Sequence, residues 1–267
     1  MGLIRPTNST AYVCFKREKV PLPPPCWCYL PQPALQTSCR AGRRLKFCSM
    51  HILSSKLTRP APPPRIVDRL HLYARLDQWP TTPVIFVHAP AGYGKSILAS
   101  RWLEVRGLDA QTAWLSLDSG DDDPLQFLRY LATALEPLAP GIIDAVLPLL
   151  DEPEAKAERA LAVLLGMLQE DAQTADENPL LLVLDDLQQI DSPALAPLMT
   201  LLLERCPARL HLMLLGRKPI YGPLARLYAA GQVLEMSESE LRFQREEIET
   251  YLAQCDFPPL TPEALTR

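Results

Sequence analysis

A strand, a glycine-rich turn and a helix are predicted in immediate succession between residues 84 and 105, and this succession constrains the fold most. Residues 84–88 read V-I-F-V-H, an apolar and β-branched run bounded by turn residues, which predicts a buried strand of a parallel sheet. The sequence continues A-P-A-G-Y-G-K-S, and I-L-A-S-R-W-L-E-V then has helical spacing. Strand, glycine loop and helix in this order are the context of a phosphate-binding loop.

The residue types of this loop suit the binding of a phosphate chain. Gly92 and Gly94 allow the backbone to turn so that successive N–H groups point at phosphate oxygens, and the following helix adds its positive dipole end. We expect Lys95 to reach the β- and γ-phosphates and the Ser96 hydroxyl to bind Mg²⁺. Ala89 stands where G-x-x-x-x-G-K-[ST] usually begins, so a chance glycine turn is the alternative. The expected nucleotide-binding residues of the loop are Ala89, Pro90, Ala91, Gly92, Tyr93, Gly94, Lys95 and Ser96.

A second apolar run ends in two carboxylates. Residues 178–186 read N-P-L-L-L-V-L-D-D, which predicts a buried strand with acidic residues at its end. We expect Asp185 to hold Mg²⁺ through its water shell and Asp186 to orient or deprotonate the attacking water. Alternatively, the two acids cap the next helix, but that helix begins near Ser192-Pro193, which is too far downstream to suit a cap.

An arginine follows a further predicted strand. Residues 210–215 read L-H-L-M-L-L and are followed by Gly216 and Arg217. The carboxyl end of a parallel strand faces the crevice in which open α/β sheets bind ligands. Arg217 is therefore a candidate for contacting the γ-phosphate, and a solvated surface arginine is the alternative.

Charge and hydropathy exclude several classes of protein. No window approaches the roughly 18 apolar residues that a membrane span needs, and the N-terminus lacks the apolar core of a secretory signal. Residues 1–49 hold eight of the 27 Lys and Arg but one of the 31 Asp and Glu, which leaves 19 basic and 30 acidic residues in 50–267. Such an acidic body gives no support for nucleic-acid binding through its own surface.

Residues 1–49 show no periodicity, and six of the fourteen residues from 20 to 33 are proline. The composition changes at Met50, so we expect residues 1–49 to be disordered or untranslated. The segment also holds five of the seven cysteines. A metal site is the alternative, but the spacing fits zinc modules poorly. Its ligands would be Cys26, Cys28, Cys39 and Cys48.

Several motifs together resemble a known family. K-L-T-R-P-A-P-P-P-R-I-V-D-R, A-P-A-G-Y-G-K-S, W-L-S-L-D-S-G-D-D-D-P, L-V-L-D-D, L-L-G-R, P-L-A-R-L-Y-A-A-G-Q-V-L-E and L-R-F-Q-R-E-E occur in this order. The set resembles the nucleotide-binding domain of MalT-like regulators, which are ATP-binding LuxR-family transcriptional activators of the STAND class of signalling NTPases. The resemblance covers residues 50–267. In that family A-P-A-G-Y-G-K-[ST] is the usual loop, and the arginine after the fourth strand falls on Arg217.

The resemblance implies a cofactor and a role. ATP with Mg²⁺ would favour an assembled active state, and slow hydrolysis to ADP would reset it. The adenine pocket would draw on the segment from Arg65 to Arg69. One departure concerns Leu187-Gln188-Gln189, which replaces the aromatic residue and histidine often found after Asp-Asp.

Family members are several times longer than this chain. They self-associate, and they bind DNA through a C-terminal helix-turn-helix that is not visible here, so DNA is expected as a partner only of a full-length regulator. We expect a cytoplasmic protein without membrane contact. The alternatives are a stand-alone P-loop ATPase, which would turn over rapidly without an effector, and an inactive fragment.

The expected fold is α/β, a three-layer P-loop NTPase with a mainly parallel five-stranded sheet, plus the disordered N-terminal segment. We divide the chain into an extension (1–49), an arm of the nucleotide-binding domain (50–80), the P-loop domain (81–257) and the start of a further helical region (258–267). Asp123-Pro124 is expected to begin a helix. The predicted strands are 84–88, 112–117, 180–184, 210–215 and 232–236, and the predicted helices between the second and third are 124–136 and 156–170.

Overall fold

The computed structural model describes residues 52–152, 154–171, 178–219, 222 and 224–255. All of them belong to the unit that spans Met50–Arg267. The segment 1–49, with its expected disorder and its cysteines, and the segment 258–267 lie outside the described residues.

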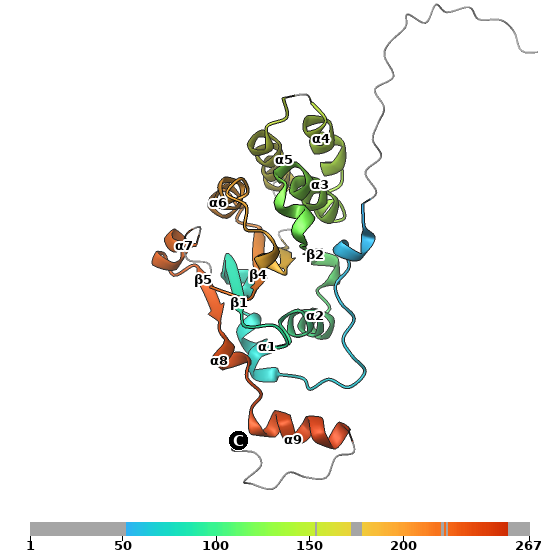
Figure 1. Ribbon diagram of the computed structural model, residues 1–267, viewed down its shortest axis with the longest axis vertical. Helices are drawn as coiled ribbons and strands as arrows, with labels where there is room; N and C mark the ends of the chain where they lie inside the picture. The colour runs from blue at the N-terminus through green and yellow to red at the C-terminus, as the bar shows by residue number, and fades with distance from the viewer. Residues whose placement is uncertain (1–51, 153, 172–177, 220–221, 223, 256–267) are drawn as a thin grey trace, which may run out of the picture. The chain divides into compact units, whose positions relative to one another are not determined.

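Five parallel strands form one sheet in the order β2-β3-β4-β1-β5. The predicted mainly parallel five-stranded sheet is confirmed, and each predicted strand end lies within one residue of the observed one. β4 follows β3 in the chain but lies between β3 and β1, and because these strands are parallel, their carboxyl ends lie at the same edge of the sheet. Figure 1 shows β4 beside β1. The strands are β1 (Val84–His88), β2 (Thr112–Ser116), β3 (Leu180–Asp185), β4 (Leu210–Gly216) and β5 (Val233–Met236).

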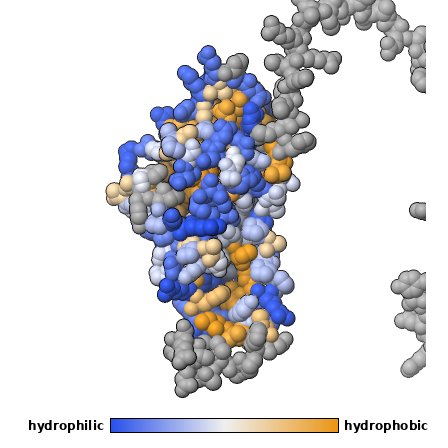
Figure 2. Space-filling model, in the orientation of Figure 1, coloured by the Kyte–Doolittle hydropathy of each residue, from blue (hydrophilic) through white to orange (hydrophobic). Residues whose placement is uncertain are grey.

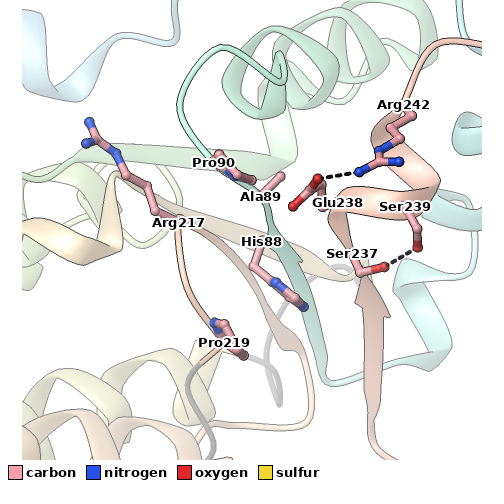
Figure 3. Close-up of a pocket in the computed structure, with 9 residues that line it drawn as sticks. All are labelled: His88, Ala89, Pro90, Arg217, Pro219, Ser237, Glu238, Ser239 and Arg242. Atoms are coloured by element: carbon pink, nitrogen blue, oxygen red, sulfur yellow. Dashed lines mark hydrogen bonds and ion pairs between the residues drawn. The ribbon is translucent and has the colours of Figure 1, made fainter. Parts of the chain in front are cut away.

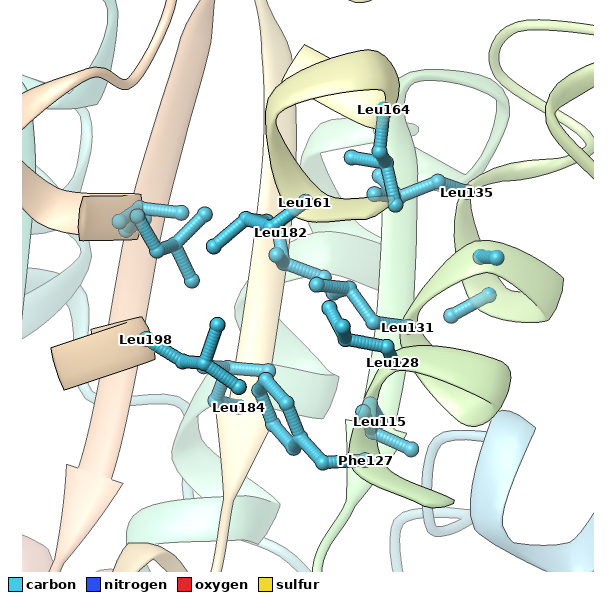
Figure 4. Close-up of a cluster of buried hydrophobic side chains, with 14 of the residues drawn as sticks. Leu115, Phe127, Leu128, Leu131, Leu135, Leu161, Leu164, Leu182, Leu184 and Leu198 are labelled. Carbon is cyan, nitrogen blue, oxygen red and sulfur yellow. The ribbon is translucent and has the colours of Figure 1, made fainter. Parts of the chain in front are cut away.

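Helices cover both faces of the sheet, as predicted. Side chains alternate across a strand, so Phe86 of β1 enters one hydrophobic cluster while Ile85 and Val87 enter another. The first cluster packs against α3 (Pro124–Leu135), α5 (Ala157–Asp171) and α6 (Ala196–Glu204), as Figure 4 shows. The second packs against α1 (Leu70–Leu76) and α2 (Lys95–Arg106).

In the long connection between β2 and β3, α3 and α5 begin within one residue of their predicted starts. Asp123 caps α3 by accepting the N–H of Gln126 at 3.0 Å, and Pro124 occupies the first helical position. α4 (Ile142–Leu150) was not predicted, and it packs against α3 and α5. It is short and contains Pro148, which lacks the N–H of a regular helix, so its apolar run gives a weak signal.

After β4, the described residues include the helices α7 (Ala225–Ala229), α8 (Glu238–Leu241) and α9 (Arg245–Gln254). α9 lies beyond α1 and away from the sheet (Figure 1). Across the described part of the chain, every helix is too short or too polar to cross a lipid bilayer.

The part of the arm that precedes α1 is held by an ion pair with a buried carboxylate. The Lys56 ammonium contacts Asp121 at 2.7 Å and Asp118 at 2.8 Å, and it lies 4.4 Å from the centre of the Tyr130 ring. Asp121 is fully buried, so the loss of Lys56 would leave an unpaired charge in the interior. This contact anchors the start of the arm, which then runs to the phosphate loop.

Candidate functional site

The glycine loop between β1 and α2 has the predicted backbone. Gly92 and Gly94 adopt φ values of +88° and +74°, which side-chain-bearing residues rarely adopt. A Cβ atom at either position would meet nothing within 4 Å, so backbone conformation, and not space, requires glycine here. α2 begins at Lys95, directly after Gly94, so the first N–H groups of the helix lie at the loop.

The Lys95 ammonium folds back onto the loop that precedes it. Its Nζ atom donates to the carbonyls of Ala89 at 2.8 Å and Pro90 at 3.0 Å. Burial lowers the pKa of Lys95, and the charges of Asp186 and Asp185 act in the opposite direction. Among the described residues, the hydrogen bonds of this buried cation go to neutral carbonyls.

The two predicted magnesium ligands lie together. The Ser96 hydroxyl donates to Asp185 Oδ1 at 2.8 Å, and the same oxygen accepts the Asp186 N–H at 2.9 Å. Burial raises the pKa of the Asp185 carboxyl, since the charged form is poorly solvated at the end of β3. A hydroxyl and a carboxylate are hard oxygen ligands, so this pair suits Mg²⁺.

Asp186 has a special backbone conformation. Among the residues that the structure describes, it is the only non-glycine residue with positive φ, at 58°. Gln188 Nε2 donates to its Oδ1 at 2.7 Å. Such conformations are uncommon outside glycine and concentrate at functional sites.

Arg217 follows β4 and lies at the same edge of the sheet. Its exposed side chain lines a pocket of about 490 Å³ together with Ala89 and Pro90 of the loop (Figure 3). Its charge contributes to lowering the pKa of Lys95, after the larger effect of burial. Glu238 and Arg242, an exposed ion pair, lie across this pocket from Arg217.

An apolar pocket of about 740 Å³ opens onto the other side of the glycine loop. Its inner walls are loop residues Gly92 and Gly94 together with Ile97 of α2. The arm supplies a second wall, which includes Ile66 and Val67. In Figure 2, apolar surface gathers toward the end of the molecule that carries α9.

The outer wall of the pocket comes from the chain after β5. It consists of Phe243, which precedes α9, and of Ile248 and Tyr251 on α9. We did not predict these residues. Ile248 and Tyr251 are three residues apart, a helical spacing that marks one face of a helix but not what that face contacts.

The two arginines expected near adenine both line the apolar pocket, but they differ in burial. Arg65 is exposed and lines the apolar pocket. Arg69 also lines it, but its guanidinium is buried and bonded to Glu247 and to the carbonyls of Leu241 and Arg242.

A further polar pair lies beside the loop. His88 Nε2 and Glu235 Oε1 are 2.6 Å apart and join the ends of β1 and β5. The sequence contains no motif that links these two residues. Their contact follows only from the pairing of β1 with β5.

A parallel sheet with a glycine loop after its first strand, and a carboxylate on the neighbouring loop hydroxyl, defines a P-loop nucleotide-binding module. Comparison with known proteins agrees. Residues 66–215 match the AAA ATPase domain family, and because this is more than half of the chain, the chain belongs to that family.

Similar proteins include bacterial transcriptional regulators. The HTH-type transcriptional regulator MalT of Cronobacter sakazakii is 29% identical over 220 residues, which cover 81% of this chain and 23% of that regulator. The MalT of Serratia proteamaculans is 32% identical over 202 residues, which cover 75% of this chain and 21% of that one. The chain therefore spans less than a quarter of the length of these relatives, and the predicted resemblance to MalT-like regulators is confirmed.

Among solved structures, Cdc6p from Pyrobaculum aerophilum is 16% identical with a TM-score of 0.47, covering 76% of this chain and 52% of that one.

Proposed function

We propose that this chain is an ATP-binding switch module that hydrolyses ATP slowly. The proposal rests on one observation: the apolar pocket opens onto the same glycine loop whose neighbouring residues, Ser96 and Asp185, form the hydroxyl–carboxylate pair. A ligand that fits both parts has a flat apolar group at one end and a chain of phosphates at the other. A nucleoside triphosphate has this form.

The loop would hold the phosphates. Its backbone N–H groups and the first turn of α2 would face the phosphate oxygens, and Lys95 would exchange its carbonyl contacts for the β- and γ-phosphates. Ser96 and Asp185 would hold Mg²⁺, which neutralises phosphate charge when it is bound. The Ser96 hydroxyl would bind the ion through an oxygen lone pair, which leaves its hydrogen donated to Asp185.

Asp186 and Arg217 would respond to the third phosphate. Asp186 would orient or deprotonate the attacking water. Gln188 donates a hydrogen bond to its carboxylate. Arg217 would contact the γ-phosphate and lose that contact after hydrolysis. A contact that exists only with ATP is what a nucleotide switch needs to favour one of two states.

The base would enter the apolar pocket between the arm and α9. Ile66, Val67 and Ile97 offer apolar contacts, and Tyr251 offers an aromatic face for stacking. Arg65 would lie at the mouth of the pocket. We assign adenine to this pocket because of the resemblance to ATP-binding regulators.

The relatives are named as HTH-type transcriptional regulators. We propose that the nucleotide state of this module sets the activity of a regulator of that kind. DNA contact is assigned to a segment outside the matched region, because the acidic body of this module does not favour DNA. Self-association is assigned to the full-length regulator.

Titration of the full chain with ATP and ADP, with and without Mg²⁺, tests the proposal. At 100 times the dissociation constant, a ligand adds about 2.7 kcal/mol to the free energy of unfolding, which corresponds to roughly 5–10 °C in Tm. We expect such a rise with both nucleotides, a larger one for ATP with Mg²⁺, and turnover well below about 1 s⁻¹. An unchanged Tm at millimolar nucleotide would refute the proposal, and rapid turnover would favour a stand-alone ATPase.

A further inference from the structure

A buried ion pair connects the arm to the last described helix. Arg69 Nε donates to Glu247 Oε1 at 2.9 Å and Arg69 Nη2 donates to Oε2 at 3.1 Å. The two side chains are 8% and 9% exposed. Two parallel hydrogen bonds fix both the distance and the orientation of the partners, so the pair defines where α9 lies relative to the arm.

The same two side chains also organise the start of α9. Arg69 donates to the carbonyls of Leu241 and Arg242, both at 2.8 Å, and lies 5.0 Å from the centre of the Phe243 ring. Glu247 Oε2 accepts the Gln244 N–H at 2.8 Å and closes the first turn of the helix. One arginine and one carboxylate therefore hold both the turn before α9 and its first turn.

α9 has little apolar attachment to the domain. In this helix, all of whose residues are described, Glu247 is the only buried residue. Ile248 is partly buried and Tyr251 is 44% exposed, and both face the pocket. A second polar bond, from Gln254 Nε2 to the Ile66 carbonyl at 3.2 Å, lies at the other end of the helix. The apolar face of α9 thus borders the pocket and is not packed against a hydrophobic core.

We propose that Arg69 and Glu247 are positioning residues that hold α9 as the outer wall of the base pocket, so that base binding and docking of α9 stabilise each other. The identity of the ligand rests on the proposed function. A base in the pocket supplies the apolar contact that Ile248 and Tyr251 lack, and the ion pair supplies the geometry. Arg69 acts through α9, because its guanidinium donates to Glu247 and to the turn before the helix.

Two measurements on the full chain test this inference. The first is the affinity for ADP and for tripolyphosphate, which carries phosphates without a base. The second is the hydrogen exchange of the α9 amides with and without ADP. The test variant is Glu247→Gln, and the matched control is Glu249→Gln, whose exposed carboxylate pairs with Arg245 on the same helix.

In Glu247→Gln we expect ADP affinity to fall about tenfold, a difference of roughly 1.4 kcal/mol. Tripolyphosphate affinity should stay as in the original protein, and the α9 amides should exchange faster without ligand. ADP should slow α9 exchange in the original protein, and Glu249→Gln should match it throughout. The amides of β1, β3 and β4 report whether the variant is folded. If it is not, Arg69→Lys replaces it, since lysine keeps the charge but loses the paired hydrogen bonds.

Unchanged ADP affinity in Glu247→Gln would overturn the inference, as would an equal loss of tripolyphosphate affinity or α9 exchange that ignores ADP. These outcomes leave the proposed function standing, because the original protein would still bind nucleotide. Failure of the original protein to bind ADP, ATP or tripolyphosphate is a different result. It refutes the proposed function, and the positioning role is refuted with it.

Discussion

The phosphate side of the site and the apolar pocket are built in different ways. On the phosphate side, one loop of consecutive residues lies beside the ends of β3 and β4, and the buried sheet holds all of these parts. The pocket is assembled from an arm and a helix that are far apart in sequence. Arg69 and Glu247, which join them, are 178 residues apart.

This difference implies that the apolar pocket can open locally while the phosphate side stays folded. Strand ends in a fully packed sheet move only when the domain unfolds, whereas a helix held by side-chain contacts at the surface can open locally. Phosphate binding should therefore resist surface mutations that weaken base binding.

Lys95→Ala should have the largest effect, because it removes the buried cation of the phosphate side. We expect the affinity for ADP and for tripolyphosphate to fall by at least about 100-fold, or roughly 2.7 kcal/mol. Calorimetric titration of both ligands measures it. The combined loss would contrast with Glu247→Gln, for which only ADP affinity should fall.

The control for this prediction is Lys156→Ala, which removes an exposed lysine near the start of α5. It carries the same change in net charge but lies outside both pockets. Lys95→Ala with normal tripolyphosphate binding would show that phosphates do not bind at the loop.

Arg217→Ala should have a smaller and more selective effect. The side chain is exposed at the edge of the sheet, so a contact with the γ-phosphate is partly screened by solvent. We expect ATP affinity to fall about fivefold, or roughly 1 kcal/mol, while ADP affinity is unchanged. The ratio of the two dissociation constants is the measurement. An unaltered ratio would remove Arg217 from the sensing role and favour the alternative of a solvated arginine.

The same division separates what the sequence predicts from what it does not. β1, β3 and β4 are predicted closely because strands buried on both faces read as continuous apolar runs. Parallel strands end at a common edge, so the proximity of Ser96, Asp185 and Arg217 could be expected from the motifs that follow those strands.

The apolar pocket could not be predicted in this way. Ile248 and Tyr251 indicate one face of a helix, yet no local pattern states that this face opposes residues of the arm. The role of Arg69 depends on the same distant contact, since a lone arginine in a sequence does not show which carboxylate it meets. α4 is absent from the prediction for another reason, because Pro148 argues against a helix that packing nevertheless stabilises.

Asp185→Asn should have the smallest effect, and it should raise the free energy of unfolding of the ligand-free protein at pH 7. Burial raises the pKa of Asp185 in the folded protein above its ordinary value of 3.8. The folded state therefore binds this proton more tightly than the unfolded chain, and the group contributes stability at low pH that is lost as the pH rises through the folded pKa. At pH 7 the ionised, desolvated carboxylate is a cost that asparagine does not carry.

Asparagine at this position still offers an oxygen to Ser96 and to the Asp186 N–H, so the local hydrogen bonds can persist. We expect the free energy of unfolding without ligand to rise by about 1 kcal/mol at pH 7, with the gain vanishing as the pH falls toward 4. Denaturant titrations across this pH range measure it, with Asp144→Asn on the exposed face of α4 as control. Mg²⁺ should then strengthen ATP binding less than in the original protein, because asparagine lacks the negative charge that attracts the ion. A variant that is less stable at pH 7 would contradict this prediction. It would show that neighbouring groups already compensate the charge of Asp185, so that the ionised carboxylate does not lower the free energy of unfolding.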